Sequence, residues 1–106
     1  MTVHITLRYF AGCPSWQTAL ANLEVAAARI GADIDVDLQN VETFEDAERC
    51  GFTGSPTLLL NGADPFAGPG TAPVLACRVY ATPAGFAGSP TVDQLAAALA
   101  ANEQSS

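Results

Sequence analysis

The sequence predicts one α/β domain over residues 1–106, in which a four-stranded mixed sheet is flanked by helices. Two kinds of periodicity predict it. Apolar residues alternate with polar ones in some segments, as in strands, and recur every three or four positions in others, as in helices. The order is strand, helix, strand, helix, strand, strand, helix. Parallel strands joined by a helix need a long crossover, whereas the last two strands are close enough to run antiparallel, so we expect a mixed sheet.

The first strand and the first helix are expected to meet at Cys13. Apolar and polar residues alternate over 3–10, which predicts a strand followed by a short turn. The helix then begins at Pro14, because proline fits the first helical position, where no N–H is needed. Cys13 is left as the cap residue, and Gly31 stands where a helix commonly ends.

The middle of the chain predicts a second strand, a short helix and a third strand. Aspartates alternate with apolar residues over 33–38, as expected for a strand with one solvated face. Thr43 followed by Asp46 is a capping-box pattern that opens a helix through Cys50. Beyond it we expect a stop at Gly51, a turn over 52–56, a strand over 57–60 and a turn at Asn61-Gly62.

The last third predicts a long loop, a fourth strand and a final helix. Thr91 with Gln94 is a second capping-box pattern, and Val92, Leu95 and Leu99 lie on one helical face. The remaining segments are expected to be a loop over 63–73, a strand over 74–80, a loop over 83–89 and a frayed tail over 102–106.

The composition favours a folded acidic protein and excludes several kinds of partner. Apolar residues make up 49% of the chain, and four arginines face eleven acidic residues, for a net charge of −7. Nucleic acids and anionic membranes require concentrated positive charge, so neither is expected as a partner. No apolar window is long enough to span a membrane and no signal segment opens the chain, so we expect a cytoplasmic protein.

The three cysteines, Cys13, Cys50 and Cys77, are widely spaced. An odd number at such spacings argues against a secreted disulfide framework and favours reduced thiols. A metal site is a weaker interpretation, because no two cysteines lie close together in sequence and His4 is the only histidine. We therefore assign no metal ligands and expect no cofactor.

Cys13 is the cysteine best placed for chemistry. The unpaired N–H groups of the first helical turn and the helix dipole would stabilise a thiolate at this position. Such a thiolate attacks disulfides, sulfenates or soft electrophiles. The alternative is that Cys13 only caps the helix.

Two motifs carry a family resemblance. With the element order, Cys-Pro-Ser-Trp at 13–16 and Gly-Ser-Pro-Thr at 54–57 resemble the thioredoxin and glutaredoxin superfamily over nearly the whole chain. The resemblance implies a thioredoxin-like βαβαββα fold in which the Ser55–Pro56 bond is cis, Pro56 faces the active cysteine and the backbone at Ser55 pairs with a substrate. The substrate-binding residues that it implies are Pro14, Trp16, Ser55 and Pro56.

The chain also departs from the family's patterns. Trp16 stands where a dithiol Cys-x-x-Cys site has its second cysteine. With its Gly-Cys-Pro-x-Trp, Gly-Ser-Pro-Thr and Ala-Cys-Arg-Val-Tyr segments, the chain looks like small bacterial thioredoxin-like proteins that have one active thiol. The first strand lacks the buried acid of thioredoxins. Residues 85–89 lack the Gly-Gly-x-Asp turn with which glutaredoxins hold glutathione, and the chain has no lysine, so glutathione is not expected as a ligand.

The other candidate residues each have two interpretations. Cys50, at the end of a helix, either resolves a mixed disulfide or is a small buried thiol. Cys77 is expected early in a strand that returns from the far end of the sheet, so we expect a buried thiol remote from Cys13. Trp16 either packs in the core beside Cys13 or stacks on a substrate.

Charged and aromatic residues elsewhere are weaker candidates. Arg8 and Arg78 fall within expected strands, where each would pair with an acid or hold an anionic substrate. His4 begins the first strand and is expected to be structural. Phe66 and Phe86 lie in expected loops, where they would cover a pocket.

Three functional hypotheses follow from these residues. The first is a thiol–disulfide oxidoreductase with a single active thiol, in which Cys13 forms a mixed disulfide that an external thiol or Cys50 resolves. The second is a non-catalytic binding module that keeps the groove between Cys13 and Pro56. The third is a thiolate site for a soft metal, of organomercurial type, which needs two converging sulfurs. The expected partners are thiol or disulfide substrates, either proteins or small molecules.

Overall fold

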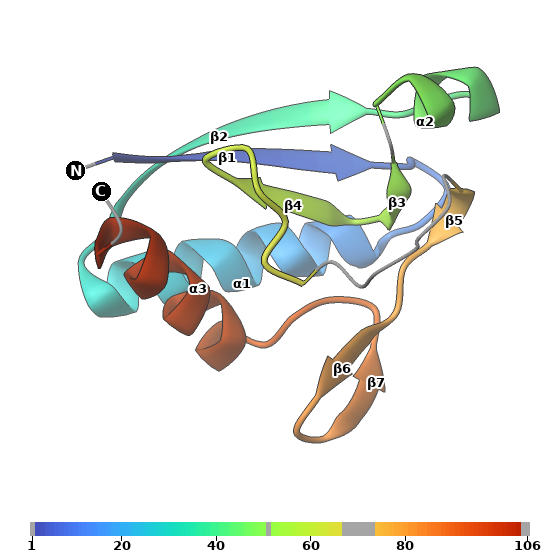
Figure 1. The fold of residues 1–106 in the computed structure, drawn as a ribbon. Coiled ribbons are helices and arrows are strands. Elements are labelled where there is room, and N and C mark those ends of the chain that lie inside the picture. The colour runs from blue at the N-terminus through green and yellow to red at the C-terminus, as the bar shows by residue number, and fades with distance from the viewer. Residues whose placement is uncertain (1, 51, 67–73, 105–106) are drawn as a thin grey trace.

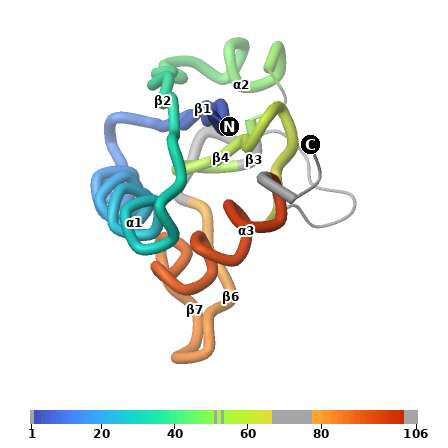
Figure 2. Tube along the Cα trace, turned by 90° about the vertical axis from the view of Figure 1, so that its left-hand side faces the viewer, coloured from blue at the N-terminus to red at the C-terminus, as the bar shows by residue number. Residues whose placement is uncertain are grey.

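A computed structural model describes residues 2–50, 52–66 and 74–104, and within them the chain is mixed α/β. The elements are β1 (Thr2–Tyr9), α1 (Ser15–Ile30), β2 (Asp33–Asn40), α2 (Phe44–Cys50), β3 (Thr53–Ser55), β4 (Thr57–Leu60), β5 (Val74–Cys77), β6 (Tyr80–Thr82), β7 (Gly85–Ala87) and α3 (Val92–Gln104). Helices α1 and α3 cover one face of the sheet formed by β1, β2 and β4 (Figure 1). The turned view in Figure 2 shows the same two-layer arrangement.

β1 is the central strand of the three-stranded sheet, between β2 and β4. It runs parallel to β2, in a register that places Thr2 opposite Asp33. It runs antiparallel to β4, with Ile5 opposite Leu60. The crossover through α1 and the antiparallel neighbour confirm a mixed sheet for these three strands.

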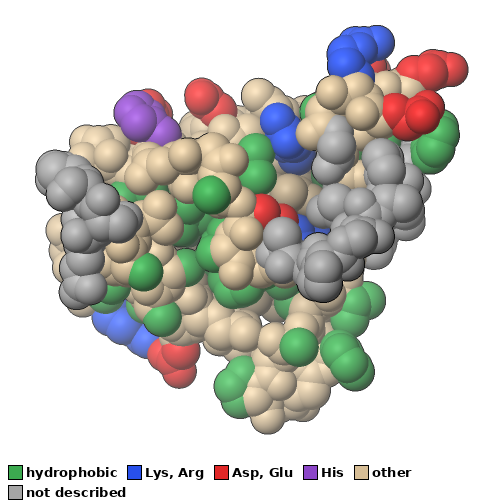
Figure 3. Space-filling view, viewed as in Figure 1, with side chains coloured by type: hydrophobic (Ala, Val, Ile, Leu, Met, Phe, Trp, Pro, Cys, Tyr) green, Lys and Arg blue, Asp and Glu red, His purple; other side chains and the backbone are tan. Residues whose placement is uncertain are grey.

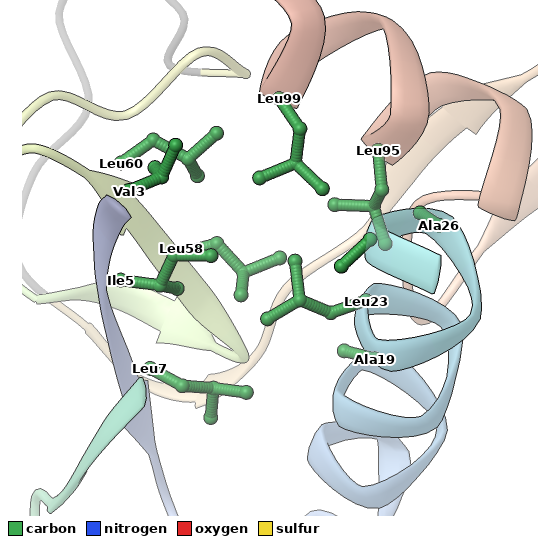
Figure 4. Close-up of a cluster of buried hydrophobic side chains, with 11 residues drawn as sticks. Val3, Ile5, Leu7, Ala19, Leu23, Ala26, Leu58, Leu60, Leu95 and Leu99 are labelled. Atoms are coloured by element: carbon green, nitrogen blue, oxygen red, sulfur yellow. The ribbon is translucent and has the colours of Figure 1, made fainter. Parts of the chain in front are cut away.

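The core lies between the sheet and the two helices. Alternate residues of β1 are buried, because successive side chains of a strand point to opposite faces. In Figure 4 these side chains and those of β4 meet Leu23 of α1 and Leu95 and Leu99 of α3. The buried residues of this cluster are Val3, Ile5, Leu7, Ala19, Leu23, Ala26, Ala27, Leu58, Leu60, Leu95 and Leu99.

Helix α1 begins one residue later than predicted. Pro14 is its N-cap, with φ −74°, and Ser15 is the first helical residue, so Cys13 lies just before the helix and not at its cap. The reason is the preceding turn, in which the N–H of Cys13 donates to the carbonyl of Phe10 at 2.9 Å. At the other end, Gly31 takes φ 68° and closes the helix as predicted.

Both expected capping residues are confirmed. At the start of α3, the N–H of Gln94 donates to Thr91 Oγ1 at 3.1 Å and the N–H of Thr91 donates to Gln94 Oε1 at 2.9 Å. At the start of α2, the N–H of Asp46 donates to Thr43 Oγ1 at 3.1 Å. These bonds satisfy N–H groups that have no partner within the helix.

The prediction of a four-stranded sheet is wrong, because the strand expected over 74–80 does not join β4. It divides into β5, which pairs parallel with β3, and β6, which pairs antiparallel with β7. Two contacts account for this. Leu60 of β4 exchanges hydrogen bonds of 2.7 and 3.1 Å with Ala63, and the N–H of Arg78 donates to the carbonyl of Ser55 at 2.8 Å. The chain after β5 is thereby held against the segment that precedes β4.

Two segments expected to be irregular contain short strands. β3 lies within the predicted turn over 52–56, and β7 lies within the predicted loop over 83–89, where Gly85 at φ 112° helps form the hairpin turn. Strands of three residues are too short to show an alternation. The β6–β7 hairpin projects from the body of the molecule (Figure 1), and apolar side chains gather on it in Figure 3. Phe86 is 83% exposed, so it faces solvent and does not cover a pocket.

Some predictions fall partly outside the described residues. Of the loop expected over 63–73, only residues 63–66 are described, and Gly51, the expected helix stop, also lies outside. Helix α3 continues to Gln104, so the part of the tail that is described is helical and not frayed. Within the described ranges, no helix is long and apolar enough to cross a membrane.

Candidate functional site

Cys13 belongs to the segment that connects β1 to α1. Figure 1 shows this segment at the end of the sheet where α2 also lies. Cys13 is 1% exposed, and its sulfur is disulfide-bonded. The sequence predicted a lone reduced thiol at this position. The structure instead has the sulfur of Cys13 already joined to a second sulfur.

The sulfur of Cys13 faces the backbone that precedes β4. Its Sγ lies 3.8 Å from the carbonyl oxygen of Ser55. The Ser55–Pro56 peptide bond is cis, as the resemblance implied, and both residues are buried. Two segments far apart in sequence therefore meet at this point, as predicted.

Two long-range hydrogen bonds hold this backbone in place. The N–H of Arg78 donates to the carbonyl of Ser55 at 2.8 Å, and the hydroxyl of Tyr80 donates to the carbonyl of Pro56. Buried carbonyl groups need donors, so these bonds satisfy both residues while fixing their position. The chain after β5 thus positions the peptide groups beside Cys13.

Gly54 is required where β3 approaches this chain segment. It has φ 117°, which favours glycine, and a Cβ added to it would lie 2.8 Å from the Cβ of Arg78. Its carbonyl accepts a hydrogen bond of 2.5 Å from Thr57 Oγ1. A side chain at position 54 would therefore push the two segments apart.

Arg78 and Asp64 form a buried ion pair next to the site. Their side chains are only 10% and 12% exposed, and Arg78 Nη1 lies 2.6 Å from Asp64 Oδ2. Nη2 also donates to the carbonyl of Phe66 at 2.7 Å, and the guanidinium lies 4.5 Å from the ring centroid of Tyr80. Of the two roles predicted for Arg78, these contacts favour pairing with an acid.

Tyr80 contacts both the Arg78–Asp64 ion pair, through its ring, and the backbone beside Cys13, through its hydroxyl. Burial raises the pKa of Tyr80 well above its usual value, while the nearby Arg78 lowers that pKa in part and Asp64 raises it. The hydroxyl therefore stays protonated and remains a donor to Pro56. Phe66, which was expected to cover a pocket, packs edge-on against this ring, with centroids 5.6 Å apart.

The side-chain hydroxyl of Ser55 is buried without a hydrogen-bond partner among the described residues. A buried hydroxyl in this state costs free energy unless a partner reaches it. It belongs to the residue whose carbonyl oxygen is 3.8 Å from the sulfur of Cys13. Beside the disulfide there is thus a buried hydroxyl for which the described part of the chain provides no hydrogen-bond partner.

The two predicted substrate-binding residues near the start of α1 have different surroundings. Pro14 is exposed at the start of the helix. Trp16 is half-buried, stacks on Tyr9 with ring centroids 4.3 Å apart, and packs against the core. The contacts of Trp16 favour the first of its two predicted roles, as part of the core.

Cys50 is a free cysteine at the end of α2, with its Sγ 4.0 Å from the carbonyl oxygen of Ala47. Because Cys13 is disulfide-bonded and Cys50 is free, the structure does not join these two cysteines. Arg8 donates to the carbonyl of Cys50 and to Gln39 Oε1, both at 3.0 Å. Arg8 thus links the end of α2 to β2 through hydrogen bonds to two uncharged oxygen atoms.

The backbone of Cys77 lies near the site, and the prediction that it would be remote from Cys13 is wrong. Cys77 is the last residue of β5, and its Cα partner in the parallel pairing with β3 is Ser55. The prediction failed because it paired this strand antiparallel with the preceding one. The side chain of Cys77, predicted to be a buried thiol, lies outside the described residues.

His4 lies on the solvated side of β1. Its Nδ1 is 3.4 Å from Asp35 Oδ2, and both side chains are largely exposed. Across the described part of the chain, no group of three or more His, Cys, Asp or Glu residues is arranged to hold a metal ion.

Asp64 and Tyr80 are the site residues that the sequence did not single out. Asp64 is an isolated acid in a segment without periodicity, and Tyr80 stood only at the end of an expected strand. Arg78 in an apolar strand was the usable signal, because a buried arginine needs an acid, although the sequence did not identify which one.

Family models, curated proteins and solved structures were each compared with the chain, and none matches it.

Proposed function

We propose that this protein is a thiol–disulfide oxidoreductase that acts through Cys13. The observation that carries the proposal is the position of the disulfide-bonded Cys13, with its sulfur 3.8 Å from the Ser55 carbonyl oxygen. Arg78 and Tyr80 anchor the peptide groups on the facing side. A fixed backbone beside a redox-active sulfur supports binding of an extended substrate segment next to the reacting atom.

In the proposed reaction the protein disulfide is the oxidant. A thiolate of a dithiol substrate attacks Cys13 Sγ, a substrate–Cys13 disulfide forms, and the second protein sulfur leaves as a thiolate. The second substrate thiolate then attacks the substrate sulfur of the mixed disulfide. This step forms the substrate disulfide and releases Cys13 as a thiolate. The substrate loses two electrons and two protons to the two protein sulfurs, and the reverse sequence reduces a substrate disulfide.

We also propose that the fold is a variant of the thioredoxin-like fold. The parallel β1–α1–β2 unit, the antiparallel β4 and the cis bond beside Cys13 support this proposal. The β3–β5 and β6–β7 pairings then take the place of a fourth strand. A reversible disulfide is compatible with a cytoplasmic protein, because cytosolic disulfides are usually transient and catalytic or redox-sensing.

The burial of Cys13 favours a second candidate function. At 1% exposure the sulfur is shielded from an incoming thiolate. Under this alternative the disulfide is a fixed crosslink and the protein is a non-catalytic binding module. The two functions differ in the reduction potential of the disulfide, since structural disulfides have potentials below about −300 mV and catalytic ones lie higher.

Catalysed disulfide exchange tests the proposal. The protein is incubated with dithiothreitol and a disulfide-bonded protein substrate, and the rate of substrate reduction is compared with the uncatalysed rate. We expect wild type and the matched control Cys50→Ser to accelerate the reaction, whereas Cys13→Ser gives the uncatalysed rate. Equal rates for all three proteins, together with a potential below about −300 mV, would contradict the proposal and identify the disulfide as a fixed crosslink, as the alternative requires.

A further inference from the structure

We propose that Cys77 provides the second sulfur of the Cys13 disulfide and acts as the resolving thiol of its redox cycle. The active centre would then be a dithiol assembled from the turn before α1 and the end of β5, two segments far apart in sequence. The resolving role rests on the proposed function. The pairing itself does not.

The cysteine content of the chain supports this pairing. The chain has three cysteines, of which Cys13 is disulfide-bonded and Cys50 is free. An intramolecular disulfide at Cys13 therefore leaves Cys77 as the remaining cysteine of the chain.

The backbone register supports it independently. β5 runs parallel to β3, and the Cα partner of Cys77 is Ser55. The carbonyl oxygen of Ser55 is in turn 3.8 Å from Cys13 Sγ. Two cysteines can be bridged only when their Cα atoms are within about 7 Å, and Ser55 is the common neighbour that brings these two backbones together.

The residue that follows Cys77 keeps this backbone in place without help from the disulfide. The N–H of Arg78 donates to the Ser55 carbonyl at 2.8 Å, and its guanidinium is held in the buried ion pair with Asp64. These contacts involve no sulfur, so they persist when the disulfide is reduced. Cys77 therefore stays near Cys13 in the reduced protein, as a resolving thiol must.

The reductive half of the cycle then balances within the chain. The Cys13 thiolate attacks a substrate disulfide, so that a Cys13–substrate bond forms and one substrate sulfur leaves as a thiolate. The Cys77 thiolate next attacks Cys13 Sγ, which forms the Cys13–Cys77 disulfide and releases the second substrate sulfur. The substrate gains two electrons and two protons, and the two cysteines lose them.

Two measurements on the full chain test the proposal. First, non-reducing peptide mapping by mass spectrometry identifies the partner of Cys13, for which we expect the peptide that contains Cys77. Second, the reduced protein is mixed with a disulfide-bonded peptide, and the mixed disulfide at Cys13 is quantified after acid quenching. We expect Cys77→Ser to accumulate about tenfold or more of this adduct compared with wild type, because its second step is blocked.

Cys50→Ser is the matched control and is expected to accumulate no more adduct than wild type. A crosslink from Cys13 to Cys50, or a Cys77→Ser variant that clears the adduct as fast as wild type, would overturn the proposal. A Cys13–Cys77 crosslink in a protein that forms no adduct in any variant would refute the oxidoreductase function and the resolving role, and leave only the pairing. Failure of the two proposals is therefore distinguishable.

Discussion

The Arg78–Asp64 ion pair should be a large contributor to stability, because each side chain is about nine-tenths buried. Removing one partner of a buried pair leaves the other charge uncompensated. We expect Asp64→Asn to lower the free energy of unfolding by about 3 kcal/mol, measured by urea denaturation. The control is Asp46→Asn, whose partner Arg49 is 78% exposed. Solvent screening limits that loss to less than about 1 kcal/mol, and equal losses in the two variants would contradict this interpretation.

Tyr80 should make the free energy of unfolding depend on pH in the alkaline range. The folded state raises the pKa of Tyr80, so above pH ~10 the unfolded chain releases its phenolic proton while the folded chain keeps it. The free energy of unfolding should therefore fall as pH rises from about 10 to 11, by about 1 kcal/mol for this group, because the unfolded phenol is half ionised at pH ~10. In Tyr80→Phe this component is absent, which unfolding curves at several pH values can check.

Tyr80→Phe should also lose about 1–3 kcal/mol of the free energy of unfolding at neutral pH, because the carbonyl of Pro56 loses its donor.

Gly54 offers a test of the contact between β3 and the chain after β5. Gly54→Ala meets both the strain of φ 117° and the Cβ of Arg78 at 2.8 Å. The matched control is Gly85→Ala, which has φ 112° but no atom within 4 Å of the new Cβ. Both variants should lose about 1 kcal/mol or more from backbone strain, and Gly54→Ala should lose further stability in thermal unfolding. Equal losses would mean that the close approach at Gly54 contributes nothing.

Among the elements, those with a long apolar period could be predicted from the sequence. β1, α1, β2 and α3 each have enough residues to show a period of two or of three to four, and local capping residues mark the starts of α2 and α3. β3, β6 and β7 have three residues each, so their pairing depends on distant contacts. The hydrogen bond from Arg78 to Ser55 is such a contact, and no local pattern specifies it.

The residues of the candidate site also divide into those that a local sequence pattern predicts and those that depend on distant contacts. Cys13, Ser55 and Pro56 were recognised because they belong to short contiguous motifs beside predicted element boundaries, and the cis bond was expected with them. Asp64 could not be identified, since its role depends on a buried partner in another strand. The disulfide bond of Cys13 was not predicted, because no second cysteine lies close to Cys13 in the sequence.

The start of α3 offers a prediction at the level of an element. Thr91 Oγ1 accepts the N–H of Gln94, and Gln94 Oε1 accepts the N–H of Thr91 in return. Thr91→Ala leaves the N–H of Gln94 without its partner, so we expect a loss of about 1 kcal/mol in urea denaturation. Thr91→Ser retains the hydroxyl and should restore most of that loss. A serine variant as unstable as the alanine variant would show that the methyl group of Thr91 matters and the cap does not.

For the whole molecule, the Cys13 disulfide should constrain the unfolded chain over a long loop if Cys77 is its partner. A crosslink over a loop of that size typically stabilises the folded state by about 4 kcal/mol. Reduction should therefore lower the urea midpoint strongly in wild type and in Cys50→Ser. Cys13→Ser should already have the low midpoint and should not respond to reductant. A midpoint in wild type that reductant leaves unchanged would argue against such a loop.

β2 is one of the two outer strands of the three-stranded sheet, and its exposed positions include Asp33, Asp35 and Asp37. An outer strand presents unpaired N–H and carbonyl groups to which the same strand of another molecule can add. At neutral pH the repeated carboxylates make two such strands repel each other. Replacing the three aspartates with asparagine would remove this repulsion, so we expect that variant to associate edge to edge into extended sheets while the wild-type protein does not.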